Sequence, residues 1–176
     1  MNLPLPIALS ISWFLLWLFS MSAYHKFSAP VYYEQLISRY IPSLPSGKSL
    51  VMALALFESA IAVALILPVS RTAATLVAAV LLSCYALLMT LEMLRGRSGM
   101  QCGCAGPDSE LGLSWALVAR NMVCVAAAML ALTANFSQSI GWLGYLLAGV
   151  VALFIALVYL TVEQIISNAQ WMAGEA

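Results

Sequence analysis

Residues 50–94 decide the fold and read LVMALALFESAIAVALILPVSRTAATLVAAVLLSCYALLMTLEML. This stretch holds two apolar runs, Leu50–Val69 and Thr72–Leu94, which are separated only by Ser70 and Arg71. A bilayer core about 30 Å thick needs roughly 20 apolar residues in a helix, so each run is long enough to cross it. The stretch therefore predicts a tight antiparallel hairpin of two transmembrane helices.

The composition of the chain indicates that lipid is its solvent. Hydrophobic residues make up 64% of the 176 residues and charged residues only 8%. Soluble domains carry roughly a quarter charged residues, so this chain has too little polar surface to cover a water-exposed globule. Seven basic residues balance seven acidic ones, and a neutral chain gives no reason to expect nucleic acid as a partner.

Three further apolar runs reach the length of a membrane span. Together with the hairpin they predict an all-α membrane protein with a single polytopic domain over residues 1–176. The predicted helices are about 3–24, 50–69, 72–94, 114–135 and 142–166. The sequence therefore predicts a five-transmembrane-helix bundle with little mass outside the bilayer.

The connection over residues 25–49 contains a short amphipathic helix. Its apolar stripe follows helical spacing and consists of Tyr33, Leu36, Ile37 and Tyr40. Ser28 is expected to cap this helix, with Pro30 in its first turn. We expect the helix to lie in the plane of the membrane interface, between the first and second transmembrane helices.

Five crossings place both long connections, residues 25–49 and 95–113, on the same side of the membrane as the C-terminus. That side, called the charged face below, also receives most of the ionisable residues of the chain. They include His25, Lys26, Glu92, Arg120 and Glu163. The opposite face has only Arg71 and the N-terminal amine, so any chemistry is expected on the charged face.

Cys102 and Cys104 are the first candidates for chemistry. A single glycine separates the two thiols, and a disulfide across so small a ring should be strained. Strained, exposed disulfides are the labile or catalytic kind, so the pair predicts redox exchange as the catalytic chemistry. Two alternatives remain open at this point: a static pair in a loop, and a site for a soft metal such as Cu(I) or Zn.

Glu58 and Arg120 each lie within an apolar run, roughly 9–12 Å below the charged face. Charges at such depth usually pair or face a cavity, and their matched depth makes the two residues candidate partners. One interpretation is a structural ion pair. The other is a polar pocket for a quinone head group or a proton path, extended by the neighbouring Asn121.

Two cysteines and two basic residues are secondary candidates. Cys84 and Cys124 lie at matched depth, which suggests a relay from the loop pair, although membrane cysteines more often pack as small hydrophobes. His25 and Lys26 follow the first predicted helix, where such a pair is usually an anchor that extends to the interface.

Several short segments carry a family resemblance. They are Ala23-Tyr24-His25-Lys26-Phe27, Glu58, Cys102-Gly103-Cys104-Ala105-Gly106 and Arg120-Asn121. In these segments the chain resembles the MauE proteins of methylamine and aromatic amine utilisation, within the broader DoxX-like group. The family pattern usually has an aromatic residue at the position of Ala105.

The resemblance implies a bacterial inner-membrane protein that helps to mature a periplasmic amine dehydrogenase. The small subunit of such enzymes carries a tryptophan-derived quinone and many disulfides, and MauE proteins are thought to act on them with a thioredoxin-like partner, MauD. The helix layout is also similar to that of the vitamin K epoxide reductase group. Residues 25–49 contain no cysteine, so there is no internal shuttle pair and electrons would have to come from a separate protein.

Three functions are therefore weighed. The first is a thiol–disulfide oxidoreductase whose obvious electron acceptor is a membrane quinone, although no motif marks a quinone site. The others are a non-catalytic scaffold that anchors the maturation partner and a soft-metal handling protein; we assign no metal ligands.

The orientation in the membrane is contested by two arguments. Basic residues gather on the charged face, at Lys26, Arg39, Lys48, Arg95 and Arg97, and the positive-inside rule would place that face in the cytoplasm. Disulfide chemistry belongs in the periplasm. We follow the chemistry and the resemblance, and we predict a periplasmic Cys102 loop.

Overall fold

The computed structural model of the chain describes residues 3–41, 47–96, 100–101, 103, 106, 111–136 and 140–174. Within these residues the protein is all-helical, as the sequence predicts. The helices are α1 (Leu5–Ser28), α2 (Pro30–Tyr40), α3 (Lys48–Ile66), α4 (Arg71–Leu94), α5 (Trp115–Ala131) and α6 (Trp142–Gly174). Among the described residues, the β structure is limited to an isolated antiparallel bridge between Gln101 and Gly112.

Four helices, α1, α3, α4 and α6, are long and apolar enough to cross a membrane. The fifth apolar helix, α5, is shorter, with 17 residues. Many large apolar side chains point outward, among them Leu56, Val63 and Leu153. A chain that exposes this much apolar surface on several long helices is a multi-pass membrane protein.

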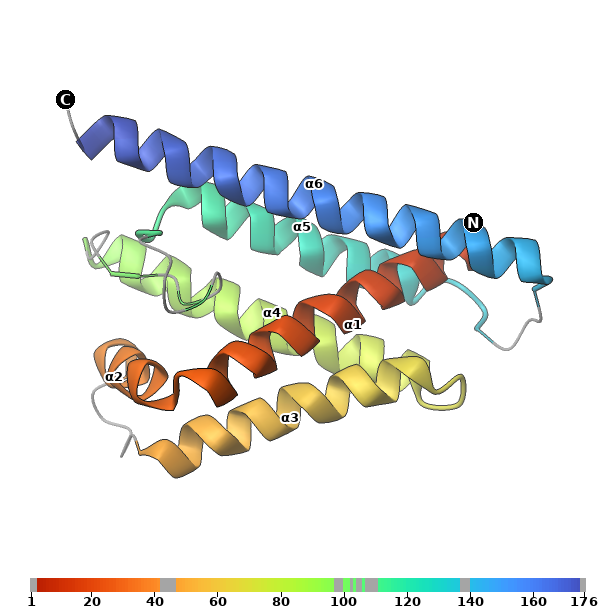
Figure 1. Cartoon of the computed structure of the whole chain (residues 1–176), viewed down its shortest axis with the longest axis horizontal. Helices are drawn as coiled ribbons and strands as arrows, with labels where there is room; N and C mark the ends of the chain where they lie inside the picture. Colours follow the sequence, from red (N-terminus) through yellow and green to blue (C-terminus); the bar gives the residue numbers. More distant parts are fainter. Residues whose placement is uncertain are drawn as a thin grey trace.

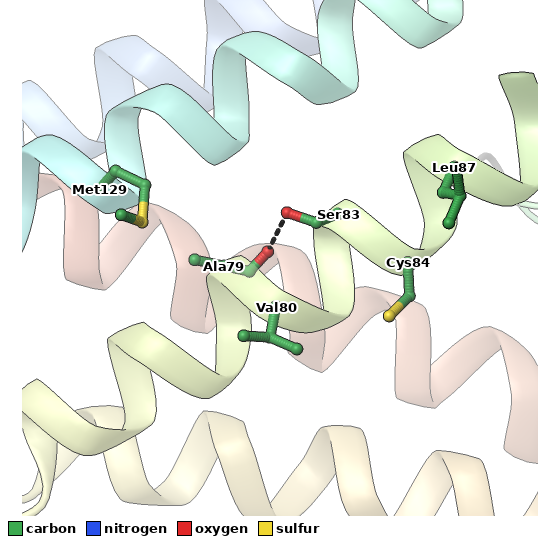
Figure 2. Close-up of a pocket in the computed structure, with 6 residues that line it drawn as sticks. All are labelled: Ala79, Val80, Ser83, Cys84, Leu87 and Met129. Atoms are coloured by element: carbon green, nitrogen blue, oxygen red, sulfur yellow. Dashed lines mark hydrogen bonds between the residues drawn. The ribbon is translucent and has the colours of Figure 1, made fainter.

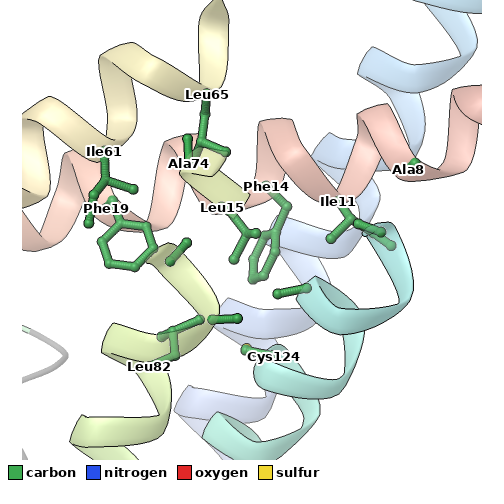
Figure 3. Packing of buried hydrophobic residues seen from close by; sticks show 14 of the residues in the cluster. Ala8, Ile11, Phe14, Leu15, Phe19, Ile61, Leu65, Ala74, Leu82 and Cys124 are labelled. Carbon is green, nitrogen blue, oxygen red and sulfur yellow. The ribbon is translucent and has the colours of Figure 1, made fainter. Parts of the chain in front are cut away.

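Helix α1 is the centre of the bundle. It crosses between α3 on one side and α6 on the other (Figure 1), and it also packs against α4 and α5. Its side chains Phe14, Leu15 and Phe19 form the middle of the main core, with Leu65 of α3 and Leu82 of α4 around them (Figure 3). Helix α1 therefore supplies the apolar side chains against which the other helices pack.

The two ends of the bundle differ in the segments that they carry. One end carries the N-terminus and the tight turn at residues 67–70 between α3 and α4. The other end gathers α2, the end of α4, the start of α5 and the C-terminal end of α6 (Figure 1). This second end is the charged face, and it positions the candidate site.

The expected boundary between the first two helices is wrong. Helix α1 continues past Tyr24 to Ser28, and Ala29, not Ser28, precedes α2. The physical reason is Pro30, because a proline disfavours helical backbone in the residue before it and is well suited to the first position of a helix. The chain therefore breaks only at Ala29, and His25 and Lys26 belong to α1.

A short helix follows at the expected place. Tyr33 and Leu36 of α2 are buried and pack against Val51 of α3, so the predicted apolar stripe faces the bundle. Its position in the plane of the membrane interface stays a prediction.

The central role of α1 predicts which phenylalanine matters for stability. Phe19 is 1% exposed, whereas Phe57 on α3 is 48% exposed. Phe19→Ala should lower the unfolding free energy by about 3 kcal/mol, which is the lower end of the range for such core truncations. The lower end applies because lipid is as apolar as the core, so the substitution loses packing contacts but no hydrophobic transfer energy. Phe57→Ala, the matched control, should change it little. Unfolding by SDS titration in micelles measures both, and equal losses would contradict the packing described.

Candidate functional site

A buried ion pair joins α1 to α3 below the charged face. The ammonium nitrogen of Lys26 lies 2.9 Å from Oε2 and 3.0 Å from Oε1 of Glu58. Lys26 is 6% exposed and Glu58 is 0% exposed. Because a buried charge is costly unless it is paired and hydrogen-bonded, each residue holds the other in place.

Two hydroxyl groups complete the shell of the Glu58 carboxylate. Tyr85 of α4 donates a hydrogen bond of 2.6 Å to Oε1 of Glu58, and Ser22 of α1 donates one of 3.1 Å to the same oxygen. Lys26 also donates to Ser22 Oγ at 2.7 Å. The carboxylate on α3 is therefore bound by donors from α1 and α4, which ties three helices together at one depth.

The interpretation of Lys26 as an anchor that extends to the interface is wrong. Its ammonium group points into the bundle and lies over the rings of Tyr33 and Tyr85, at 5.3 and 5.8 Å from their centroids. The cause is the length of α1, because the helix continues through Lys26 and turns its side chain toward Glu58.

A second ion pair lies between α5 and α6, and it corrects the expected partner of Glu58. Arg120 donates to Glu163 at 2.7 Å and its guanidinium lies 4.5 Å from the centroid of the Tyr159 ring. Glu58 and Arg120 are therefore not partners. Matched depth predicts height in the bundle, but it does not predict the direction in which a side chain leaves its helix.

The side chain of Asn121 forms a hydrogen bond between two helices. Its side-chain amide donates to the carbonyl oxygen of Leu82 on α4 at 3.1 Å. This bond links α5 to α4 next to Arg120.

A cavity of about 490 Å³ lies between these two ion pairs. Its lining includes Lys26, Tyr85, Arg120, Asn121 and Glu163, together with His25. Glu58 does not line the cavity itself, but it accepts hydrogen bonds from three side chains that do: Ser22, Lys26 and Tyr85. The structure thus brings most of the predicted polar residues to one cavity, although it does not pair them as expected.

Cys102 and Cys104 lie outside the described residues, but their neighbours are anchored against this cavity. The Tyr33 hydroxyl donates to the carbonyl oxygen of Gly103 at 3.0 Å, and the Tyr40 hydroxyl donates to that of Gln101 at 3.2 Å. Gly103 itself lines the cavity. The backbone beside the cysteine positions is therefore held by two tyrosines of α2.

Two glycines permit this close approach. Gly103 has a φ of +72° and a Cβ at this position would collide with Leu36. Gly106 has a φ of +95°, and a Cβ there would lie 2.9 Å from the His25 ring. Positive φ is strained for residues with a Cβ, so both positions need glycine to lie against α1 and α2.

Further hydrogen bonds hold the two ends of the same loop, at residues 100–101 and 112–113. The bridge between Gln101 and Gly112 joins the two sides of the loop, and the Leu113 amide donates to the Met100 carbonyl at 2.7 Å. Gln170 of α6 bonds to both the amide and the carbonyl of Gly112, each at 2.9 Å. Helices α2 and α6 therefore hold the loop from two sides.

The two remaining cysteines lie in different surroundings. Cys84 is exposed on the flank of α4 near Val80, Leu87 and Met129 (Figure 2). Cys124 is buried in the main core near Leu82 (Figure 3). Their equal depth does not bring them to one place, so the geometry gives no support to a relay between them.

Sequence reasoning missed Ser22, Tyr85 and the pairing role of Glu163. Ser22 lies one helical turn before Lys26, a spacing that places both side chains on the same face of α1. Tyr85 was a polar group inside an apolar run, which is the signal that could have marked it. Among the described residues, no group of three or more His, Cys, Asp and Glu side chains could hold a metal.

The two ion pairs predict a specific pattern of energetic coupling. Lys26→Met and Glu58→Gln should each cost about 3–5 kcal/mol of unfolding free energy, because each strands a buried charge. The double variant should cost clearly less than the sum. The control cycle, Glu58→Gln with Arg120→Gln, should be closer to additive. Additive losses for Lys26 and Glu58, measured by the same SDS titrations, would show that the pair is not formed.

The chain is similar in sequence to one family of known proteins. The family model described as methylamine utilisation protein MauE matches residues 5–134. The MauE protein of Paracoccus denitrificans is 35% identical over 91 residues, which are 52% of this chain and 48% of the relative. The MauE protein of Paracoccus versutus is 32% identical over 118 residues, or 66% and 63% of the two chains.

These relatives are matched over part of their length. The chain spans about half of the first relative and less than two thirds of the second. No solved structure matches the chain. The matched segment, residues 5–134, runs from α1 through α5 and contains both the Lys26–Glu58 pair and the Cys102 loop. By this match over most of its residues, the chain belongs to the MauE family.

Proposed function

We propose that this protein is the membrane component of a periplasmic thiol–disulfide system that serves methylamine utilisation. Its client is the disulfide-rich small subunit of an amine dehydrogenase, and its partner is a thioredoxin-like protein of the MauD type. Cys102 and Cys104 are the exchanging thiols. The names of the two relatives support the metabolic context.

The hydrogen bond from Tyr33 to the Gly103 carbonyl is the observation that carries this proposal. It fixes the residue between the two cysteines beside the cavity that Lys26 and Arg120 line. Exchange of a disulfide needs an accessible thiolate. An anchored loop over such a cavity suits a redox pair better than it suits a simple membrane anchor.

Electrons must enter or leave through another protein. In thiol–disulfide exchange, a thiolate attacks one sulfur of a disulfide and forms a mixed disulfide between the two proteins. The second thiol of a cysteine pair then attacks this mixed disulfide and separates the two proteins. Residues 25–49 contain no cysteine that could form an internal shuttle pair, so the electrons come from a separate thioredoxin-like partner.

The same proposal includes five crossings and a periplasmic charged face. Helix α5 runs antiparallel to α4 within the bundle (Figure 1) and is apolar throughout except at Arg120 and Asn121. Its 17 residues reach the lower limit for a span. The positive-inside rule counts basic residues in the connections outside the membrane, and Lys26 is not one of them because it is buried in the bundle. The other basic residues of the charged face are Arg39, Lys48, Arg95 and Arg97. The rule therefore still opposes this orientation.

Topology is tested with reporters fused at Gly174. A periplasmic charged face predicts that alkaline phosphatase fused there is active and that a cytoplasm-dependent fluorescent reporter is dark. An impermeant maleimide should label Cys102 in intact cells that carry Cys84→Ala and Cys124→Ala. The reverse reporter pattern would place the loop in the cytoplasm and remove the proposed exchange with periplasmic clients.

The cysteine pair is tested by serine substitutions. Cys102→Ser and Cys104→Ser should each abolish maturation of the client, and one of them should trap a mixed disulfide with the partner because the resolving thiol is gone. Cys84→Ala and Cys124→Ala, the matched controls, should leave maturation nearly unchanged. The measurement is the disulfide content of the amine dehydrogenase small subunit in each strain.

Each rival function gives a different result in the same strains. A scaffold without redox chemistry predicts normal client disulfides in both serine variants. A soft-metal protein predicts metal that copurifies with the wild type and is lost in both serine variants. Either result would overturn the thiol–disulfide proposal.

A further inference from the structure

We propose that His25 accepts and returns the proton of the attacking thiol when Cys102 and Cys104 exchange with a client disulfide. This inference rests on the proposed function, because it names the side chain that generates the thiolate. His25 is the only histidine of the chain. Histidine is the side chain whose charge ordinarily changes between about pH 5 and 8, so it suits proton transfer to and from a thiol near neutral pH.

The His25 ring lies against the loop that carries the two cysteines. A Cβ at Gly106 would lie 2.9 Å from Cε1, 3.0 Å from Nδ1 and 3.4 Å from Nε2 of this ring. The edge that carries both nitrogens is therefore the part of the imidazole nearest to Gly106. Gly106 follows Cys104 by two residues, and Gly103, which precedes Cys104 directly, lines the same cavity as His25.

The imidazole of His25 is available for proton transfer. The side chain is half-buried and lines the cavity beneath the loop. Among the residues that the structure describes, none forms a hydrogen bond or an ion pair with this side chain. It contacts the ring of Tyr24, with 5.8 Å between the two centroids. An imidazole nitrogen that is not already bound to a donor can take a proton from a thiol.

The other charged side chains of the described cavity lining are already paired. Lys26 is bound to Glu58 and Arg120 to Glu163. Ammonium and guanidinium groups have no lone pair for a proton, and the carboxylate of Glu163 is neutralised by its arginine. His25 is therefore the best-placed proton acceptor of this lining. Three tyrosine hydroxyls of the lining donate hydrogen bonds to fixed acceptors: Tyr33, Tyr40 and Tyr85.

The proton transfer balances within the exchange reaction. A free thiol has a pKa of about 8.5, so only a few per cent of it is thiolate at neutral pH. His25 takes the proton from the sulfur, so one S–H bond breaks and one N–H bond forms. The thiolate then attacks the client's disulfide, whose S–S bond breaks while the S–S bond of the mixed disulfide forms. The leaving sulfur of the client takes the proton from His25.

Alkylation by iodoacetamide tests this role without any partner protein. The full chain is reduced with a phosphine in detergent and carries Cys84→Ala and Cys124→Ala, so that Cys102 and Cys104 are its only thiols. Mass spectrometry gives the alkylation rate of each thiol. In His25→Ala at least one of the two rates at pH 7 should fall about tenfold, because alkylation follows the thiolate fraction.

Two readouts separate proton transfer from a purely structural role. Above about pH 9.5 thiols ionise without help, so the rates of the wild type and of His25→Ala should there agree to within about twofold. Free imidazole in the buffer should restore most of the lost rate in His25→Ala at pH 7, because it supplies the missing base. A displaced loop would change the rate at every pH and would not respond to imidazole, and this result would overturn the inference.

The neighbouring residue on α1 supplies the matched control. Tyr24 is 62% exposed and contacts the His25 ring, but it is not among the described residues that line the cavity. Tyr24→Ala should therefore keep the wild-type rates. If the melting temperature shows that His25→Ala does not fold, the pH profile of the wild type decides. Rates of both thiols that rise with the midpoint of a free thiol, about pH 8.5, would contradict the inference.

The inference and the proposed function can fail separately. Unchanged alkylation in His25→Ala at pH 7 would remove the inference, whereas loss of client disulfides in the Cys102→Ser and Cys104→Ser strains would still support the proposed function. Alkylation that depends on His25, together with normal client disulfides in both serine strains, would do the opposite. It would leave a proton-accepting histidine beside the thiols and remove the thiol–disulfide function.

Discussion

The carboxylate of Glu58 is the constraint on which the rest of the structure depends. It is fully buried in a bundle that has little polar material, so it must be neutralised and hydrogen-bonded where it stands. Lys26, Ser22 and Tyr85 do this from two neighbouring helices. Their donor positions set the relative heights of α1, α3 and α4, because a shift of one helical turn would strand the charge.

The same constraint shapes the charged face. To reach Glu58, Lys26 must still be helical, so α1 continues until Pro30 ends it. Helix α2 then packs over the end of α3, and its tyrosines bind the backbone beside the cysteine positions. The ion pair, the short helix and the loop are therefore linked steps, and together they leave a cavity beneath the loop.

The sequence predicted the apolar helices well because hydropathy over a span length is a strong, local signal. The end of α1 was predicted too early because Lys26 looked like an interfacial charge, although the helix-breaking Pro30 was visible further along. The partners of Glu58 and Arg120 could not be predicted, since they depend on how helices rotate about their axes. Hydropathy carries no information on that rotation, and neither does depth.

Stability alone does not explain why two ion pairs flank one cavity. Replacing a buried ion pair by apolar residues of similar volume is often neutral or stabilising, and lipid makes that replacement easier still. A bundle selected only for packing would have filled this space with leucine. Lys26 and Arg120 instead hold their charges at the cavity wall, against Glu58 and Glu163. Ionisable groups kept inside a membrane domain at such cost mark a site that handles charge, protons or a polar ligand.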